Sequence, residues 1–208
     1  MLEIIKPMDI EKRSFEIITE LLGDTKIAPE NELVVKRVIH TSADFDYAQN
    51  LVFSEGAVAK GIAALRSGCD IVTDTQMARA GINKTILGKL GGEVHCFMSD
   101  PDVVAEAKAR GITRAIVSME KAATLEKPCI FAIGNAPTAL IAIKELMEAG
   151  KLHPALIIGV PVGFVNVVES KEEIIEANLA PYIVARGRKG GSNVAAAICN
   201  AMLYQITR

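Results

Sequence analysis

The chain has 208 residues, and half of them are hydrophobic, which predicts one domain with a sizeable apolar core. Its net charge of −2 excludes an overall field that would attract nucleic acid or an anionic membrane, and no apolar run approaches the about 18 residues of a transmembrane helix. Aromatic residues make up only 4%, so the core must consist of Ala, Val, Ile and Leu, which suits helices packed on a parallel sheet.

Residues 1–53 are predicted to form a mainly helical arm. Apolar residues recur at helical spacing over 10–22, between a candidate N-cap at Asp9 and a candidate stop at Gly23. A second helix is predicted over 30–41. The first residues of the chain are charged, so we expect no secretory signal and a cytoplasmic protein.

Residues 54–208 alternate short apolar runs with helical segments, which is typical of a parallel sheet covered by helices. We predict a flavodoxin-like three-layer α/β/α core with a five-stranded parallel sheet in the order 2-1-3-4-5. Together with the arm it forms a single domain over 1–208. The predicted strands are 70–73, 94–98, 129–133, 155–158 and 182–185. The predicted helices are 55–67, 76–90, 101–110, 135–149, 170–178 and 191–206.

Ligands of such sheets bind beyond the carboxyl ends of the strands. At that edge the run RGRKGGSN places Arg188 and Lys189 just before a helix that begins near Ser192. This pattern indicates a phosphate or carboxylate site, although a solvated basic turn with a serine cap explains it equally well. Asn135, in the run GNAPTAL, is either a helix cap or an amide that contacts a ligand. A Walker A loop is absent, and no G-x-G-x-x-G follows the first core strand, so a nucleotide cofactor is poorly supported.

Three histidines and four cysteines are the remaining candidates for chemistry. His40 follows Arg37 by three residues, which places both on one helical face, where they are suited to an anionic ligand. His95 lies in an apolar strand and is interpreted as a satisfied histidine in or near the core, and His153 as a surface residue. The cysteines are far apart and are expected to be buried and reduced. No spacing favours a metal site in the protein itself.

Six segments resemble the precorrin-8X methylmutase family, also called cobalt-precorrin-8 methylmutase or precorrin isomerase. They read EKRSF (11–15), VKRVIHTSADFDY (35–47), DIVTDTQMARAGI (70–82), IGNAPTAL (133–140), GVPVGFVNVVESKE (159–172) and RGRKGGSNVAAAICNA (186–201). The resemblance covers nearly the whole chain. It implies a flavodoxin-like homodimer that moves a methyl group from C11 to C12 of a corrin ring in cobalamin biosynthesis. No cofactor is expected, although the substrate can carry cobalt.

The resemblance also implies roles for single residues. It makes His40 the proton donor, and it places Arg37 and Ser14 in contact with the substrate. Arg114 resembles a further family arginine near the pocket. The substrate-binding prediction is completed by the residues of the sheet edge, Asn135, Arg188, Lys189 and Ser192, and the basic loop is expected to set affinity more than rate. Two alternatives remain open at this point: a non-catalytic corrinoid carrier, and another α/β enzyme acting on a phosphorylated or polycarboxylate metabolite.

Overall fold

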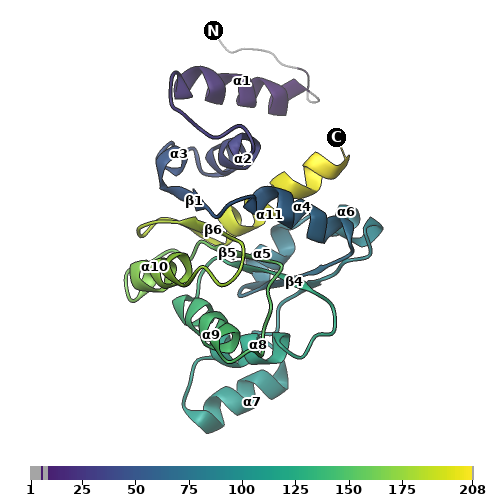
Figure 1. Ribbon diagram of the computed structural model, residues 1–208. Coiled ribbons are helices and arrows are strands. Elements are labelled where there is room, and N and C mark those ends of the chain that lie inside the picture. The colour runs from purple at the N-terminus through teal and green to yellow at the C-terminus, as the bar shows by residue number, and fades with distance from the viewer. Residues whose placement is uncertain (1–5, 7–8, 208) are drawn as a thin grey trace.

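A six-stranded sheet runs through the middle of the computed structural model, which describes residue 6 and residues 9–207 (Figure 1). The strands are β1 (Leu51–Phe53), β2 (Asp70–Thr73), β3 (Val94–His95), β4 (Cys129–Ile133), β5 (Leu156–Gly159) and β6 (Tyr182–Ala185). Their order across the sheet is β1-β6-β5-β4-β2-β3. The five strands from β2 to β6 are all parallel, and their order is the predicted 2-1-3-4-5.

The sixth strand, β1, was not predicted. It belongs to the segment expected to be a helical arm, and it pairs antiparallel with β6 so that Leu51 lies opposite Ala185. Three residues are too few to show the alternation by which a strand is found in a sequence. The arm therefore contributes an edge strand to the sheet.

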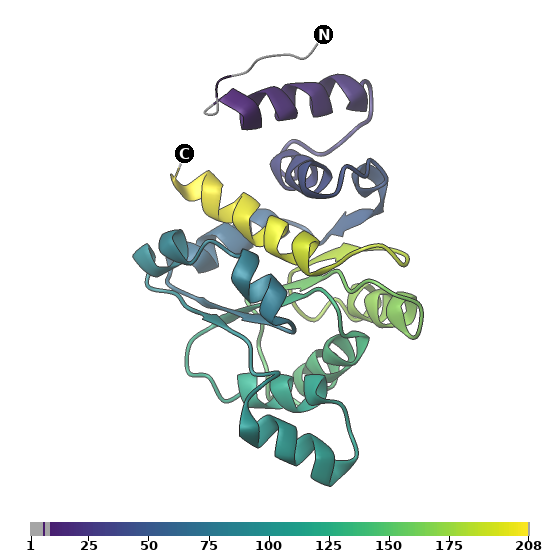
Figure 2. The same cartoon turned by 180° about the vertical axis from the view of Figure 1, so that it is seen from behind.

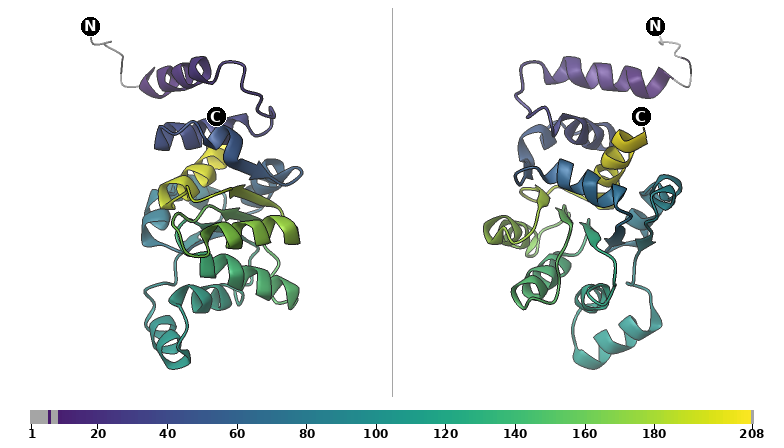
Figure 3. Two further views of the ribbon diagram at one scale, coloured as in Figure 1. Left: turned by 90° about the vertical axis from the view of Figure 1, so that its left-hand side faces the viewer. Right: turned by 45° about the vertical axis from the view of Figure 1, so that its right-hand side comes forward.

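Helices cover both faces of the sheet (Figures 1 and 2). One face carries α2 (Glu32–Ser42), α4 (Ala57–Arg66), α5 (Gln76–Gly81), α6 (Lys84–Lys89) and α11 (Ser192–Thr207). The other carries α8 (Arg114–Ala122), α9 (Pro137–Glu148) and α10 (Val167–Ala177). Two helices lie outside these layers, α1 (Ile10–Leu22) against α2 and α7 (Pro101–Arg110) against α8 (Figure 3). A short helix, α3 (Tyr47–Asn50), joins α2 to β1.

Alternating strand residues divide the core into two halves, because successive side chains of a strand point to opposite faces. In β4, Ile130 packs with the helices around α11, whereas Phe131 packs with α8, α9 and α10. Ile198, Cys199 and Met202, near the centre of α11, are all 0% exposed. The long helix α11 therefore anchors α2, which packs along it.

Several elements of the structure differ from the predicted ones. The helix predicted over 76–90 is two helices, because the chain turns at Asn83, whose side chain accepts from the Ile86 N–H and begins α6. Helix α8 has no counterpart among the predicted helices, and the strand predicted over 94–98, which is β3 in the structure, ends at His95. Among the described residues, no helix is long and apolar enough to cross a membrane.

Candidate active site

Asp74 organises the carboxyl edge of the sheet between β2 and β4. The strand order reverses at this point, because β3 lies on one side of β2 and β4, β5 and β6 follow on the other. The Asp74 side chain is 1% exposed and accepts hydrogen bonds from the N–H groups of Gly134, Asn135 and Ala136, at 2.8, 2.8 and 2.6 Å. Burial raises the pKa of Asp74, and the three N–H groups oppose that change. The carboxylate fixes the turn between β4 and α9, a role that no sequence pattern predicted.

The first turn of α11 meets the same edge. Ser192 and Thr75 share a hydrogen bond of 2.7 Å between their hydroxyl groups, and Thr75 also caps α5 by accepting from the Ala78 N–H. A Cβ atom at Gly134 would lie 2.7 Å from the Ser192 Cα, so only glycine permits this approach. Ser192, predicted to bind substrate, thus has a structural partner at the reversal point of the sheet.

The basic loop, residues 186–191, projects beside this point. It extends from the edge of the sheet between α3 on one side and α10 on the other (Figures 1 and 2). Arg188 donates from Nη1 to the Phe164 carbonyl at 2.8 Å, and its guanidinium lies 5.5 Å from the Phe164 ring centre. Lys189 pairs with Asp44 and Asp46 of the α2–α3 connection, at 2.7 and 2.6 Å. Those carboxylates raise the pKa of Lys189, and its ammonium lowers the pKa of Asp44.

The predicted acid lies on the arm. His40 is exposed in the last turn of α2, and its ring centre is 5.6 Å from that of Phe15 in α1. Arg37, one turn earlier, places its guanidinium 4.7 Å from the Phe15 ring centre and 5.1 Å from that of Tyr204. Its Nη2 donates to Glu11 at 2.9 Å. Both residues therefore share the face expected from their spacing, and Arg37 already holds one carboxylate of its own chain.

The remaining predicted residues are placed separately. Ser14 donates its hydroxyl to the Ile10 carbonyl of its own helix at 2.9 Å. Asn135 has an exposed side chain, while its backbone is held by Asp74. Arg114 begins α8 on the opposite face of the sheet from α2 and donates to the Met98 carbonyl at 3.2 Å. Among the described residues, no hydrogen bond joins Arg114 to His40 or Arg37.

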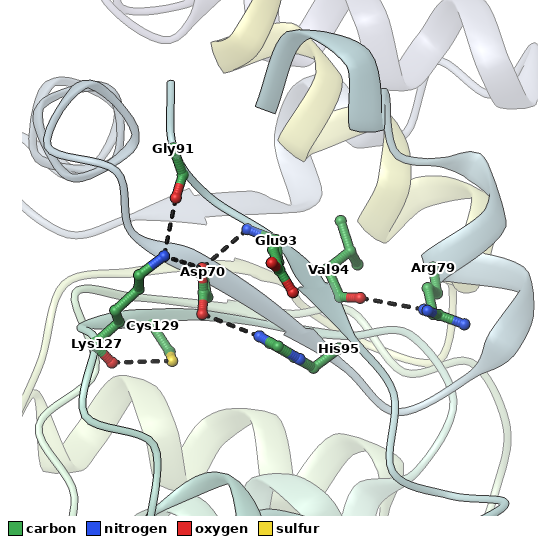
Figure 4. A network of polar contacts seen from close by, with 8 residues as sticks. All are labelled: Asp70, Arg79, Gly91, Glu93, Val94, His95, Lys127 and Cys129. Carbon is green, nitrogen blue, oxygen red and sulfur yellow. Dashed lines mark hydrogen bonds and ion pairs between the residues drawn. The ribbon is translucent and has the colours of Figure 1, made fainter. Parts of the chain in front are cut away.

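His95 belongs to a polar network at the amino end of the sheet (Figure 4). Its Nε2 is 2.9 Å from Oδ2 of Asp70, whose Oδ1 accepts from the Glu93 N–H at 2.8 Å. Lys127 bridges Asp70 at 3.5 Å and the Gly91 carbonyl at 2.9 Å. The network joins β2, β3 and the segment before β4. His95 is thus a satisfied histidine near the core, as predicted, and it lies away from the carboxyl edge.

Two other predictions about side chains can be compared with the structure. All four cysteines are free and buried, as expected. His153 is exposed beside a cavity of about 270 Å³ at the amino end of the sheet. Among residues 6 and 9–207, no three His, Cys, Asp or Glu side chains lie close enough together to hold a metal ion.

Comparison with known proteins identifies the family. A family model described as precorrin-8X methylmutase matches residues 9–205. The cobalt-precorrin-8 methylmutases of Priestia megaterium and Salmonella typhimurium are 48% and 46% identical to the chain, covering 95% and 98% of it and 88% and 97% of their own lengths. A precorrin-8x methyl mutase from Thermus thermophilus, solved by crystallography, superposes with a TM-score of 0.87 at 38% identity, over 96% of this chain and 98% of that one.

The chain belongs to the precorrin-8X methylmutase family. It is therefore an isomerase of cobalamin biosynthesis. Within this methylmutase, two buried polar residues near the carboxyl edge of the sheet were not predicted from the sequence. They are Asp74, which directly follows a strand, and Lys171, which has the sequence pattern of any charged residue in an amphipathic helix.

Proposed function

We propose that this methylmutase moves a methyl group from C11 to C12 of precorrin-8 or its cobalt form, giving hydrogenobyrinic or cobyrinic acid. His40 donates the proton, and the nearby cations bind acidic groups on the rim of the substrate. The observation that carries the proposal is the position of the exposed His40. Its imidazole lies on the same face of α2 as the Arg37 guanidinium, and both groups contact Phe15.

The apolar and cationic side chains near the carboxyl edge of the sheet suit the chemistry of a corrin ring. Such a ring has broad apolar faces and a rim of carboxylates. Phe164 and Val165 are 80% and 79% exposed in the loop after β5, and Arg188 contacts Phe164. Arg37 offers five N–H donors, of which Glu11 takes one, so it has the capacity for a substrate carboxylate as well. An apolar surface next to arginines suits a ligand with both properties.

The reaction is an internal rearrangement, so substrate and product have the same atoms. Protonation of the conjugated system near ring C draws electron density away from it and eases migration of the methyl group. The same proton returns to His40 when the rearranged ring forms, which is general acid–base catalysis. Because substrate and product have the same atoms, the reaction needs no cofactor or methyl donor. Any cobalt is bound in the substrate.

The proposal includes a homodimer in the cytoplasm. Helix α1 buries Ile18 and Leu22 against its own chain, yet Ile10, Ile17 and Leu21 are 52%, 37% and 67% exposed. A helix with apolar residues on two faces is suited to a second partner, and a second copy of the chain is the commonest one. Four buried free thiols agree with a reducing compartment.

The test is to mix the protein with metal-free and with cobalt-containing precorrin-8 and to follow the visible spectrum. Conversion of either substrate to the matching product supports the proposed function and shows which form is used. A spectral change that reflects stoichiometric binding without turnover would instead support a carrier. Binding of phosphorylated metabolites with no response to either corrinoid would favour a different enzyme.

A further inference from the structure

Lys171 is a buried lysine beneath the basic loop. It lies in the first half of α10 with 0% of its surface exposed, and its Nζ donates to the carbonyl oxygens of Gly187 at 2.8 Å and of Lys189 at 2.9 Å. The carbonyl between them, of Arg188, accepts from the Gly163 N–H at 3.2 Å. Three successive carbonyl groups of the loop are thus held by α10 and by the connection that leads to it.

This arrangement sets the direction of the rest of the loop. The chain has no cis peptide bond among the described residues, and in a planar trans peptide the N–H points opposite to the carbonyl. The N–H groups of Arg188, Lys189 and Gly190 therefore point away from the groups that hold the carbonyls. Within the part of the chain that the structure describes, none of the three donates to a protein acceptor.

The loop cannot relax toward the core. A Cβ atom at Gly190 would lie 2.1 Å from the Val160 carbonyl oxygen, so the backbone there already touches the residue that follows β5. On the outer side, Arg188 is attached to the Phe164 carbonyl. The loop therefore has one orientation as long as its carbonyl groups keep their donors, and Lys171 supplies two of the three bonds.

Packing alone does not explain an amine at this position. Burial lowers the pKa of Lys171 to about 8, although the charge of Glu172 acts in the opposite direction, so enclosing the ammonium opposes folding. A methionine would fill a similar volume without that penalty. An unfavourable buried charge that bonds only loop carbonyls indicates a role in the loop.

We propose that Lys171 is a positioning residue for substrate binding. By holding the carbonyl oxygens of Gly187 and Lys189 inward, it turns these negative dipoles away from the acidic rim of the substrate and keeps Arg188 in place. Lys171 does not touch the substrate. This inference rests on the proposed function, and the experiment below separates the failure of one from the failure of the other.

The experiment compares Lys171→Met with Lys60→Met in the full-length protein. Lys60 also donates to a backbone carbonyl, that of Glu55 at 2.9 Å, but it is exposed on α4. The measurements are kcat and KM for cobalt-precorrin-8, the Kd for cobyrinic acid from the visible spectrum, and the thermal midpoint. For Lys171→Met we expect KM and Kd to rise about tenfold, kcat to change less than about threefold, and the midpoint to hold or increase. Lys60→Met should match the wild type.

A double variant identifies the route of the effect. If Lys171 acts through Arg188, Lys171→Met with Arg188→Ala should bind little more weakly than Arg188→Ala alone. Lys171→Gln, whose amide retains an N–H donor, should raise KM less than Lys171→Met and serves as the test if the latter does not fold. Unchanged KM in a folded variant, or failure of both variants to fold, would overturn the inference. Wild-type protein that neither binds nor converts a corrinoid would instead refute the proposed function.

Discussion

Phe15 contacts both of the residues on which the proposed chemistry depends. Its ring lies 5.6 Å from the His40 imidazole and 4.7 Å from the Arg37 guanidinium, measured to the ring centre. Glu11, one turn before Phe15 in α1, holds the other side of Arg37. Helix α1 thus limits the motion of the Arg37 and His40 side chains of α2, while the His40 residue itself remains exposed.

Replacement of His40 by alanine is expected to reduce turnover by about a hundred- to ten-thousand-fold, the usual contribution of a general acid. The Kd for cobyrinic acid should change little, because Arg37, Arg188 and the apolar loop remain. Because His40 is exposed, the fold should tolerate the change. Turnover and spectral titration measure the two effects separately.

His153→Gln is the matched control, since it removes an exposed histidine at the opposite edge of the sheet. It should leave turnover at the wild-type value. Wild-type turnover in His40→Ala would show that another group supplies the proton.

At the scale of elements, ion pairs connect segments that are distant in the chain. Lys189 joins the loop after β6 to Asp44 and Asp46, which follow α2 directly. Lys189 was expected to bind a carboxylate of the substrate, but its ammonium group already pairs with two carboxylates of its own chain. We now expect Lys189 to influence binding mainly by holding the end of α2, which carries His40, against the core.

The variant Asp44→Asn/Asp46→Asn tests this interpretation. If Lys189 is a tie between elements, the double variant should raise KM as Lys189→Ala does, and the triple variant should add nothing further. If Lys189 contacts the substrate directly, removing the two aspartates should lower KM, because its positive charge would no longer be compensated. Steady-state kinetics with cobalt-precorrin-8 distinguishes the two results.

Asp70 connects the amino ends of β2 and β3 and the segment before β4 (Figure 4). Burial alone would raise its pKa, but the hydrogen bonds from His95 and the Glu93 N–H, with the charges of His95 and Lys127, together lower it. A carboxyl group with a lowered pKa stabilises the fold at pH values above its unfolded pKa of about 3.9 and loses that contribution as pH falls through the folded pKa.

We therefore expect Asp70→Asn to reduce the free energy of unfolding at pH 7 by about 1–3 kcal/mol, the effect of losing buried hydrogen bonds to a charged group. The difference between variant and wild type should shrink below about pH 4. Urea denaturation from pH 7 to pH 3 measures it. Asp24→Asn, on the exposed turn after α1, should show no such difference, and a constant deficit for Asp70→Asn at every pH would contradict the explanation.

At the scale of the whole molecule, α1 lies farthest from the sheet on its side of the protein (Figures 1 and 3). Helix α1 packs on α2, and α2 packs on α11, so one side of the arm is buried against its own chain. Its exposed apolar residues remain without cover in the single chain. A second copy packed there would also lie near Arg37 and His40.

Light scattering should give the mass of a dimer for the wild type at working concentration. Leu21→Glu should shift the mass toward the monomer, because the side chain is 67% exposed in one chain and would become buried in the dimer. The control Leu179→Glu, at a residue 54% exposed after α10, should remain dimeric. A fully active wild-type monomer would refute the dimer.

The sequence by itself determined most of the sheet. Short apolar runs predicted the bounds of β2, β4 and β6 as the structure has them, and the alternation of strand and helix predicted the order of the five parallel strands. These patterns can be read from short stretches of the chain, because the spacing of apolar residues records which face of a strand or helix is buried. The three-residue spacing of Arg37 and His40 likewise determined their common face.

Only the tertiary structure decided which polar groups meet. Asp74 caps a turn about 60 residues away, Lys189 pairs with Asp46 across 143 positions, and Lys171 reaches the loop after the next strand. No local pattern distinguishes these residues from ordinary surface charges. Their roles depend on which loops the completed sheet brings together, and their hydrogen bonds gain strength only where that packing excludes water.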